Sequence, residues 1–392
     1  MLEKRVKRQV IARQHTFFIP TTLGLEKICA AQVRSLGLIP SGTGEGGVVF
    51  EGRLTDMYRA CLHLSLANRV LMRIDEFKAS NFPGLEKGLD QIPWELYLPA
   101  SCPVHVRVTA HKSRLYHSRA IEERVQKSIT DRLRDFGEKP PHSEQGLGQE
   151  IFVRAVSDRF TLSLDACGEL MHKRGFKETS GEAPIRETLA AAILHLAGYN
   201  GRLPLMDPMC GSGTFSSEAA LIAANIPPGW RRDFAFFSWP AFREQQWHYL
   251  RTQASEQFKK ITQPLIFASD IDEKACMILL ENLKNQNLDH IVSVSNEDVL
   301  SLEPPPGFAK PGLIVVNPPY GLRLGTETQA RELFTALCQH LAEHFQGWKL
   351  AILAPRPDWM PLAPFSRPPR QKVLHHGGLK IPLLIGKIES AG

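Results

Sequence analysis

The stretch at 207–214 reads Asp207-Pro208-Met209-Cys210-Gly211-Ser212-Gly213-Thr214. It follows a short apolar run and precedes a segment with helical spacing that starts at Phe215. Two glycines in so short a turn let the backbone bend sharply and approach a ligand without a Cβ clash. A strand, a glycine turn and a helix in this order are typical of an α/β sheet that binds a ligand at its strand ends. We therefore expect a cofactor at this turn.

The alternation of strands and helices continues on both sides of the turn, over residues 181–392. The apolar runs that predict strands are Leu203–Met206, Leu265–Ala268, Ile291–Val294, Leu313–Val316 and Leu350–Leu353. The spacings that predict helices are Ile185–Leu196, Phe215–Asn225, Asp272–Gln286 and Thr328–Phe345. Strands that alternate with helices imply a mostly parallel sheet covered on both faces, which is a Rossmann-like, doubly wound α/β domain.

The pattern around the turn limits the kind of cofactor. A nicotinamide fingerprint would continue as G-x-G-x-x-G, but its sixth position is Ser216 here. A phosphate loop would require G-K-[ST], which the sequence lacks. The sequence thus favours a nucleoside cofactor without a pyrophosphate.

Aspartates follow successive predicted strands and could bind the parts of such a cofactor. Asp270 can accept hydrogen bonds from both ribose hydroxyls, and Asp298 can accept one from the adenine amine. Asp207 can hold a cationic methionine portion, whereas Asp272 is expected to cap the following helix. The predicted cofactor set is Asp207, Pro208, Met209, Cys210, Gly211, Ser212, Gly213, Thr214, Asp270 and Asp298.

A second polar loop, Asn317-Pro318-Pro319-Tyr320-Gly321, closes the strand Leu313–Val316. The prolines lack backbone donors and stiffen the turn, which leaves the Asn317 side-chain oxygen and the Pro318 carbonyl free to accept hydrogen bonds. Two acceptors aimed at an –NH₂ group orient its lone pair, and Tyr320 offers a face for a planar base. Both loops together suit methyl transfer from S-adenosyl-L-methionine to an exocyclic amine, with in-line positioning as the main source of rate. The predicted catalytic residues are Asn317, Pro318, Pro319 and Tyr320.

Composition bounds the class of protein. A length of 392 residues predicts two or three domains, and no apolar stretch approaches the roughly 18 residues of a membrane span. The charged amino terminus shows no secretory signal. Seven cysteines without a C-x-x-C pair indicate neither a disulfide framework nor a zinc site. We expect a cytoplasmic protein without a metal.

The front half carries all the positive excess. Residues 1–180 contain 27 Lys and Arg against 21 Asp and Glu, a net charge of +6, whereas residues 181–392 contain 20 of each. Residues 14–80 alternate strand and helix and suggest a small ferredoxin-like unit. Residues 104–109 form one alternating strand that leads into a basic segment with the side chains that bind phosphates and stack on bases. Its candidate RNA-binding residues are Lys112, Arg114, Tyr116 and His117.

A family resemblance rests on Ala183–Ala192, Asp207–Thr214 and Asn317–Gly321. With these motifs the chain resembles bacterial ribosomal RNA large-subunit guanine-N2 methyltransferases. The resemblance implies a ferredoxin-like domain at 1–80, a THUMP RNA-binding domain at 81–172 and an S-adenosylmethionine-dependent methyltransferase domain at 181–392. It places Thr188 beside the cofactor and the aromatic stretch 226–262 near the active face, although core packing explains most of those aromatics equally well. It also covers His172–Gly175, where Lys173 and Arg174 are candidate RNA-binding residues.

The implied reaction is methylation of the N2 amine of a guanosine in 23S ribosomal RNA, either free or in a ribosomal precursor. The N-P-P-Y loop alone is shared with adenine DNA methylases and with glutamine methylases of release factors. An N6-adenine methyltransferase acting on DNA or RNA is therefore the main alternative. A third hypothesis is an RNA-binding assembly factor with a vestigial cofactor pocket. The choice of guanine over adenine rests on the resemblance.

Overall fold

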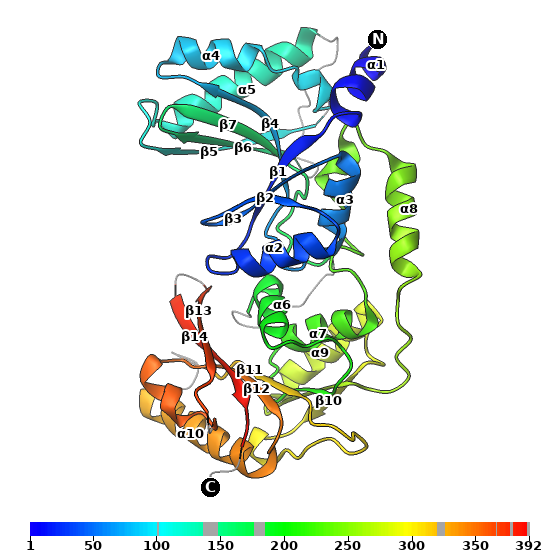
Figure 1. Cartoon of the computed structure of the whole chain (residues 1–392), viewed down its shortest axis with the longest axis vertical. Helices are drawn as coiled ribbons and strands as arrows, with labels where there is room; N and C mark the ends of the chain where they lie inside the picture. The colour runs from blue at the N-terminus through cyan, green and yellow to red at the C-terminus, as the bar shows by residue number, and fades with distance from the viewer. Residues whose placement is uncertain are drawn as a thin grey trace. The chain divides into compact units, whose positions relative to one another are not determined.

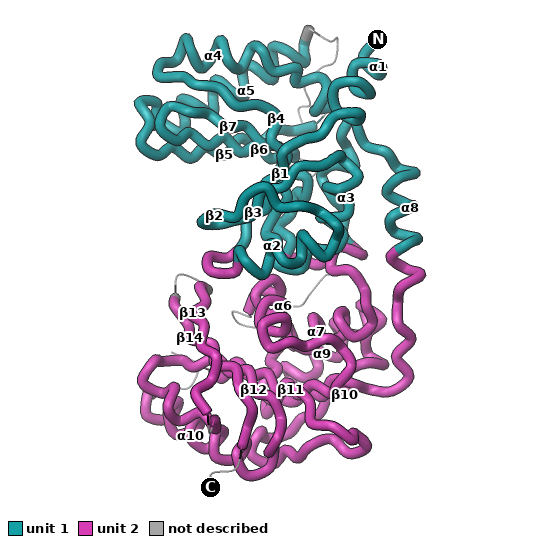
Figure 2. The backbone as a smooth tube through the Cα atoms, in the orientation of Figure 1, with its two compact units in different colours: residues 1–21, 26–171, 232–253 teal, residues 22–25, 172–231, 254–392 magenta. Residues whose placement is uncertain are grey.

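The computed structural model describes residues 1–99, 102–135, 148–175, 185–319, 326–365, 367–376 and 379–389. These residues divide into two compact units (Figure 2). Unit 1 comprises residues 1–21, 26–171 and 232–253, and unit 2 comprises residues 22–25, 172–231 and 254–392. Each unit contains one seven-stranded sheet. Among the described helices none is long and apolar enough to cross a membrane.

The first part of unit 1 has the β-α-β-β-α-β order of a ferredoxin-like domain. Its elements are β1 (His15–Pro20), α2 (Glu26–Ser35), β2 (Pro40–Gly44), β3 (Gly47–Gly52), α3 (Leu54–His63) and β4 (Leu71–Lys78), after a short helix α1 (Leu2–Val6). The strands pair antiparallel in the order β2-β3-β1-β4. The alternation of strand and helix expected over residues 14–80 is confirmed, but the sequence does not predict β2, whose proline, glycines and lack of large apolar residues hide an edge strand.

The second part of unit 1 extends the same sheet. Its elements are α4 (Phe82–Asp90), β5 (Val104–His111), α5 (Ser118–Asp135), β6 (Gln149–Val156) and β7 (Arg159–Asp165). Strand β7 pairs antiparallel with β4, so the sheet continues as β4-β7-β6-β5, and α4 and α5 lie on one side of these strands (Figure 1). The expected boundary near residue 80 thus separates two parts that share one sheet. The assignment of 81–172 to a THUMP domain stays a prediction.

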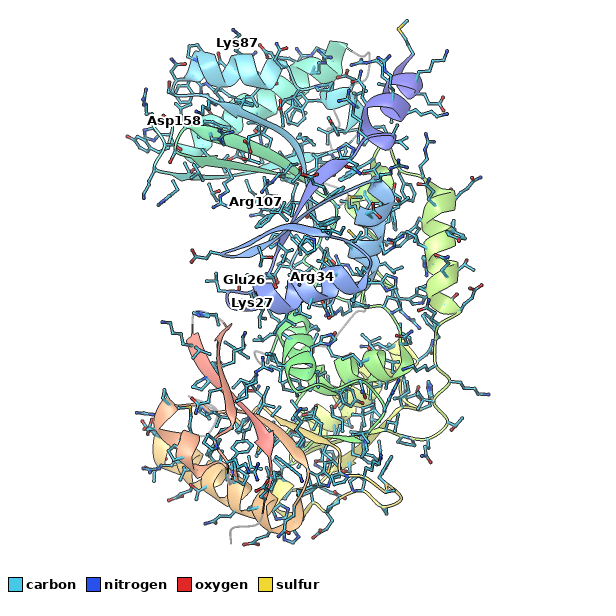
Figure 3. All side chains as sticks on the ribbon, in the orientation of Figure 1. Glu26, Lys27, Arg34, Lys87, Arg107 and Asp158 are labelled. Atoms are coloured by element: carbon cyan, nitrogen blue, oxygen red, sulfur yellow. The ribbon has the colours of Figure 1, made fainter. Side chains whose placement is uncertain are left out.

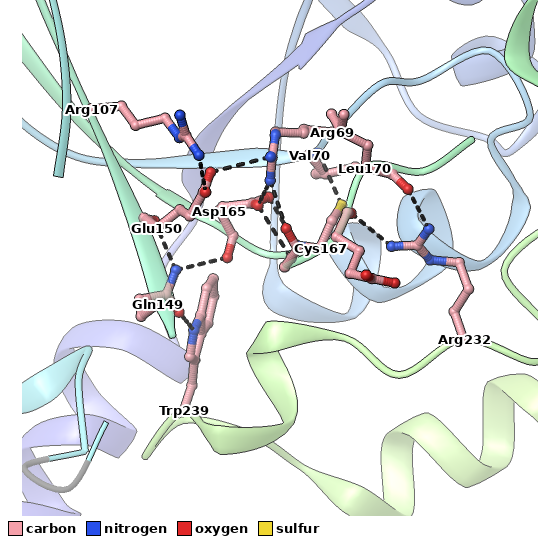
Figure 4. A network of polar contacts seen from close by, with 12 residues as sticks. Arg69, Val70, Arg107, Gln149, Glu150, Asp165, Cys167, Leu170, Arg232 and Trp239 are labelled. Carbon is pink, nitrogen blue, oxygen red and sulfur yellow. Dashed lines mark hydrogen bonds and ion pairs between the residues drawn. The ribbon is translucent and has the colours of Figure 1, made fainter. Parts of the chain in front are cut away.

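Most of the aromatic stretch expected near the active face belongs to the core of unit 1. Residues 232–253 fold onto this unit, with the Phe236 ring stacked on Tyr58 at 4.6 Å between centroids. The indole Nε1 of Trp239 donates to the side-chain oxygen of Gln149 at 2.7 Å (Figure 4). Phe236 is fully buried. Core packing, and not the active face, accounts for these aromatics.

Unit 2 is the predicted doubly wound α/β domain. Its parallel strands are β8 (Leu205–Asp207), β9 (Ile266–Asp270), β10 (Val292–Asn296), β11 (Leu313–Val316) and β12 (Lys349–Leu353), and its main helices are α6 (Glu187–Leu196), α7 (Thr214–Ala224), α9 (Glu273–Gln286) and α10 (Glu327–His344). The strand order is β10-β9-β8-β11-β12-β14-β13. The hairpin β13 (Arg370–His376) and β14 (Leu379–Lys387) joins β12 antiparallel and was not predicted.

Helices cover both faces of this sheet. Helix α10 packs Phe334, Leu337 and Leu341 against Ile314 and Ile352 in one buried cluster, and α6 and α7 lie on the opposite side (Figure 1). The chain leaves β8 toward β9 on one side and reaches β11 on the other, so the strand order reverses between β8 and β11. Ligands of doubly wound sheets bind at such a reversal, beyond the carboxyl ends of the strands.

Candidate functional site

A cavity of about 780 Å³ lies beyond the carboxyl ends of β8, β9, β10 and β11. Its walls come from the loops that follow these four strands. The predicted site residues that line it are Pro208, Met209, Cys210, Gly211, Ser212, Thr214, Asp270, Asp298, Asn317 and Pro319. The structure therefore brings together two loops that are about a hundred positions apart in the sequence.

The glycine turn has the backbone conformation that its glycines were expected to supply. Gly211 and Gly213 both adopt left-handed φ angles, of 53° and 82°. A Cβ atom on Gly213 would also lie 2.1 Å from Cδ1 of Leu279 in α9, whereas one on Gly211 would meet nothing within 4 Å. Gly213 thus lets α7 begin directly against α9, and it fixes where the amino end of α7 meets the cavity.

Asp270 ties the end of β9 to the glycine turn. Its Oδ2 accepts a hydrogen bond from the Gly211 backbone N–H at 2.8 Å, and its Oδ1 accepts one from Asp272 N–H at 3.0 Å. The carboxylate is half-buried and lines the cavity. Each oxygen keeps a second lone pair for a ligand hydroxyl. Asp272 caps α9 by accepting from Lys274 N–H at 2.9 Å, as the sequence predicts.

Asp207 lies behind the turn, and the expectation that it holds the methionine portion of a cofactor stays a prediction. Its side chain is fully buried and does not line the cavity. One oxygen accepts a hydrogen bond from Ser216 Oγ in α7 at 2.7 Å, and among the described residues the other has no partner. Burial raises the pKa of this carboxyl to about 7. Asp207 therefore connects β8 to α7 and supports the turn from below.

Asn317 presents an acceptor at the wall of the cavity. It directly follows β11, and within the described part of the chain its buried Oδ1 has no hydrogen-bond partner. A buried carbonyl oxygen without a partner is costly, so its persistence at a cavity wall points to a ligand donor. Pro318 is buried and Pro319 lines the cavity. Tyr320 lies outside the described residues, so its expected stacking role stays a prediction.

Sequence reasoning missed the apolar wall of the cavity. Ile271 and Leu300 line it although their side chains are 73% and 41% exposed. Ile271 follows Asp270 by one position, and Leu300 follows Asp298 by two. An apolar residue so close to a predicted cofactor-binding aspartate was the signal in the sequence that could have identified them. Asp298 also lines the cavity and accepts from Leu300 N–H at 2.9 Å, as the cap of a short 3-10 helix, Val299–Ser301. Thr188 is buried inside α6 and is not part of the lining.

The charge of the lining discriminates between ligands. Three aspartates and one lysine line the cavity: Asp270, Asp272, Asp298 and Lys274. An acidic cavity repels a pyrophosphate and attracts a cation, such as a sulfonium with an ammonium group. Its apolar wall and polar strand ends suit a nucleoside. The residues present therefore fit S-adenosyl-L-methionine better than a nucleotide.

The expected RNA-binding residues separate into exposed and buried ones. Arg114 and Tyr116 are 75% and 64% exposed, and the Tyr116 ring lies 4.2 Å from that of His117. Lys112 is exposed in a left-handed conformation, and Lys173 is exposed as well.

Arg174 must be reassigned. It is 3% exposed, and its guanidinium donates to both carboxylate oxygens of Glu218 in α7, at 2.8 and 3.0 Å. A buried, bidentate ion pair does not present its cation to RNA. Arg174 instead joins the segment before the first α/β helix to the helix that carries the glycine turn.

Comparisons with known proteins show the family to which the chain belongs. Residues 174–371 match the family described as the RMKL-like methyltransferase domain, and residues 16–71 match the RlmL ferredoxin-like domain. The chain is 33% identical over 344 residues to the candidate RNA methyltransferase YpsC of Bacillus subtilis, covering 87% of this chain and 88% of that protein. It is 35% identical to the ribosomal RNA large subunit methyltransferase K/L of Syntrophotalea carbinolica, with 87% and 49% covered. The chain spans about half the length of the K/L relatives that it matches.

Solved structures share the whole architecture. SMU.472, a candidate methyltransferase solved with S-adenosylhomocysteine, superimposes with a TM-score of 0.85 at 29% identity, covering 97% of this chain and all of that one. A protein from Listeria monocytogenes described as a predicted N6-adenine-specific DNA methylase gives the same TM-score and identity over 96% and 97%. The chain belongs to the RMKL-like methyltransferase family.

Proposed function

We propose that this chain transfers a methyl group from S-adenosyl-L-methionine to the exocyclic N2 amine of a guanosine in 23S ribosomal RNA. The single observation that carries the proposal is the buried Oδ1 of Asn317, which has no hydrogen-bond partner among the described residues and lies at the wall of an acidic, nucleoside-sized cavity. The K/L relatives, named as large-subunit ribosomal RNA methyltransferases, support the RNA substrate. The neighbour solved with S-adenosylhomocysteine supports the cofactor.

The loops after β8, β9 and β10 would bind the cofactor. The cofactor supplies a methyl carbon that its sulfonium makes electrophilic. Asp270 accepts from the ribose hydroxyls, and Asp298 accepts from the adenine amine. Ile271 and Leu300 exclude water from the base. Gly211 brings the backbone of the turn close to the methionine portion, where no Cβ atom intervenes.

The loop after β11, with Asn317 and Pro318, would bind the target amine and is called the amine clamp below. Asn317 Oδ1 and the Pro318 carbonyl accept the two N–H bonds of the target amine, which directs its lone pair at the methyl carbon. The new N–C bond forms as the C–S bond breaks, and the electron pair of that bond stays on sulfur. The methylated amine then loses one proton to water. Because positioning supplies most of the rate, no general base of unusual pKa is required.

The front part of the chain would bind the RNA. Lys112, Arg114, Tyr116 and His117 combine cations with aromatic rings, which suits phosphates and unstacked bases. A target guanosine inside a helix must leave its stack to reach the clamp. Residues 81–172 would then act as the THUMP domain and residues 181–392 as the methyltransferase. This substrate implies a cytoplasmic location.

The experiment is methylation of 23S ribosomal RNA purified from cells that lack this chain. The full-length protein is supplied with S-adenosylmethionine labelled in its methyl group, and the RNA is digested to nucleosides for mass analysis. We expect N2-methylguanosine as the labelled product. Asn317→Ala should lower the rate about a hundredfold or more, as removal of one positioned polar group in an active site does. Asn285→Ala, an exposed asparagine at the outer surface of α9, is the matched control and should leave the rate unchanged.

A second candidate is methylation of the N6 amine of adenine, since the same clamp fits that amine and the Listeria neighbour bears that description. N6-methyladenosine as the product, or DNA outcompeting RNA as the substrate, would replace the first proposal with this one. Binding of RNA without any methylated product would favour the non-catalytic assembly factor.

A further inference from the structure

In the second part of unit 1 the helices α4 and α5 lie on one face of the sheet, and among the described residues no helix of this part lies on the other (Figure 1). Val106, Ile151, Val153, Leu162 and Leu164 alternate along β5, β6 and β7 and are buried on the side of α4 and α5. The residues between them point to the other side. Figure 3 shows Arg107 on the side of the sheet opposite to Lys87 of α4.

The strand register places a row of cations and aromatics on this open face. Arg107 pairs with Phe152, Phe152 with Ser163, and Ser163 with Arg73, across β5, β6, β7 and β4. The Arg73 guanidinium lies 5.9 Å from the centre of the Phe18 ring in β1. Residues paired across neighbouring strands project from the same face. The row therefore carries two arginines and two phenylalanines over five strands, with the buried Ser163 at its centre.

The two rings are arranged as platforms. The Phe18 ring lies against Gly47 of β3, where a Cβ atom would be 2.5 Å from its Cε2 atom. Phe152 is partly exposed, and the Arg69 guanidinium lies 5.4 Å from its centre. A flat aromatic face beside a guanidinium is the arrangement on which unstacked bases are bound by sheet surfaces.

The charge of the open face is positive. Its cations are Arg73, Lys78, Arg107, Arg154 and Arg159, and its carboxylates are Glu76, Glu150 and the buried Asp165, which pairs with Arg69. Glu76 pairs with Arg159, and Glu150 is shared between Arg107 at 2.7 Å and Arg69 at 3.1 Å (Figure 4). Arg154 is exposed and, among the described residues, has no ion-pair partner. The excess of cations matches a polyanion.

The face is continuous with the basic segment that the sequence singles out. His111 ends β5 and lies in the same row as Val156 and Arg159. Asp158, in the turn between β6 and β7, accepts from Arg114 N–H at 2.7 Å and so fixes the segment beside this edge of the sheet. A strand of RNA that crosses the face would reach the exposed Tyr116 ring at this edge.

We propose that the open face of β4, β7, β6 and β5 binds a single-stranded RNA segment, with bases stacked on Phe152 and Phe18 and phosphates bound by Arg154, Arg107 and Arg73. The choice of RNA rests on the proposed function. A duplex does not fit as well, because its bases are stacked on one another and cannot reach the rings.

The test is the binding of a fluorescent single-stranded RNA 12-mer to the full chain, measured by anisotropy over a range of salt concentrations. Phe152→Ala should weaken binding about tenfold, because one stacked base is lost, and Phe152→Tyr, which keeps the stack, should restore it. Arg154→Ala should weaken binding and reduce the salt slope by about 0.7, the value for one phosphate on a single strand. Arg119→Ala, a 91% exposed arginine of α5 on the helix side, is the charge-matched control and should change neither.

The proposal is overturned if Phe152→Ala and Arg154→Ala bind like Arg119→Ala, or if duplex RNA or single-stranded DNA competes better than single-stranded RNA. Its failure differs from failure of the proposed function. If the variants bind RNA normally and the chain still forms N2-methylguanosine, the proposed binding surface is wrong and the proposed function stands. If the variants bind RNA more weakly but the product is not N2-methylguanosine, the proposed binding surface stands and the proposed reaction is wrong.

Discussion

The two seven-stranded sheets of this protein place their polar side chains differently. In unit 2 the residues of β11, Leu313–Val316, are all buried, because helices cover both faces of the parallel sheet. In unit 1 the residues of β5 alternate between exposed and partly or fully buried, because helices cover one face. Polar groups of unit 2 are therefore confined to the strand ends, where they build a cavity, while those of unit 1 run along the strands and form a surface.

The ion pairs Arg174–Glu218 in unit 2 and Arg107–Glu150 in unit 1 should differ most in how much they contribute to the free energy of unfolding. Arg174 and Glu218 are 2% and 3% exposed in unit 2, whereas Arg107 is 61% exposed in unit 1. Arg174→Ala leaves Glu218 buried without its cation, and we expect it to lower the free energy of unfolding by about 3–5 kcal/mol. Arg107→Ala should cost about 0–1 kcal/mol, since Glu150 keeps Arg69. Urea unfolding of both variants measures this, and equal losses would contradict the comparison.

The two glycines of the turn, Gly211 and Gly213, should differ in how much an alanine in their place destabilises unit 2. Gly213→Ala adds a Cβ that collides with Leu279 and also forces a left-handed alanine, so we expect a loss of about 2–4 kcal/mol in the free energy of unfolding. Gly211→Ala imposes only the backbone strain, about 1–2 kcal/mol. Chemical unfolding of the pair checks the order. If Gly211→Ala proves the more damaging, the close packing of α7 on α9 is not what the turn requires.

Asp207 makes the stability of unit 2 depend on pH. Its pKa is raised from 3.8 to about 7 in the folded chain, so the folded state binds the proton more tightly than the unfolded state. The contribution of Asp207 to stability is therefore fully present below pH 3.8 and falls by about 1.4 kcal/mol per pH unit as the pH rises between the two pKa values. Asp207→Asn keeps the shape of the protonated acid and should remove this slope. Urea unfolding from pH 5 to 7.5 compares the two chains, and identical slopes would show that Asp207 does not titrate in this range.

The sequence predicts the parallel part of unit 2 well because most of its strands are short apolar runs followed by a polar residue. The same rule brings Asn317 and Asp270 to the cavity. It does not find the hairpin β13 and β14, whose first strand is rich in basic residues and whose second contains Pro382. In unit 1 it misses β2 for a similar reason. Strands that lack an apolar run carry little signal in a single sequence.

Errors about single residues come from partners that are distant in the sequence. Arg174 sits in a basic run that suggests RNA binding, but its partner Glu218 follows 44 positions later in α7. Residues 232–253 fold onto unit 1 because of contacts such as Phe236 with Tyr58. The direction in which a side chain points and the residue that it contacts depend on the tertiary structure, and residue type alone does not encode them.

A crystal structure of the full chain with bound S-adenosylhomocysteine tests the central claim most directly. The account predicts the ligand in the cavity between the turn at Gly211 and the loop at Asn317, with its ribose hydroxyls within hydrogen-bond distance of Asp270. Its sulfur should face the Asn317 side chain. Density for the ligand at any other place in unit 2, or a sulfur turned away from Asn317, would contradict it.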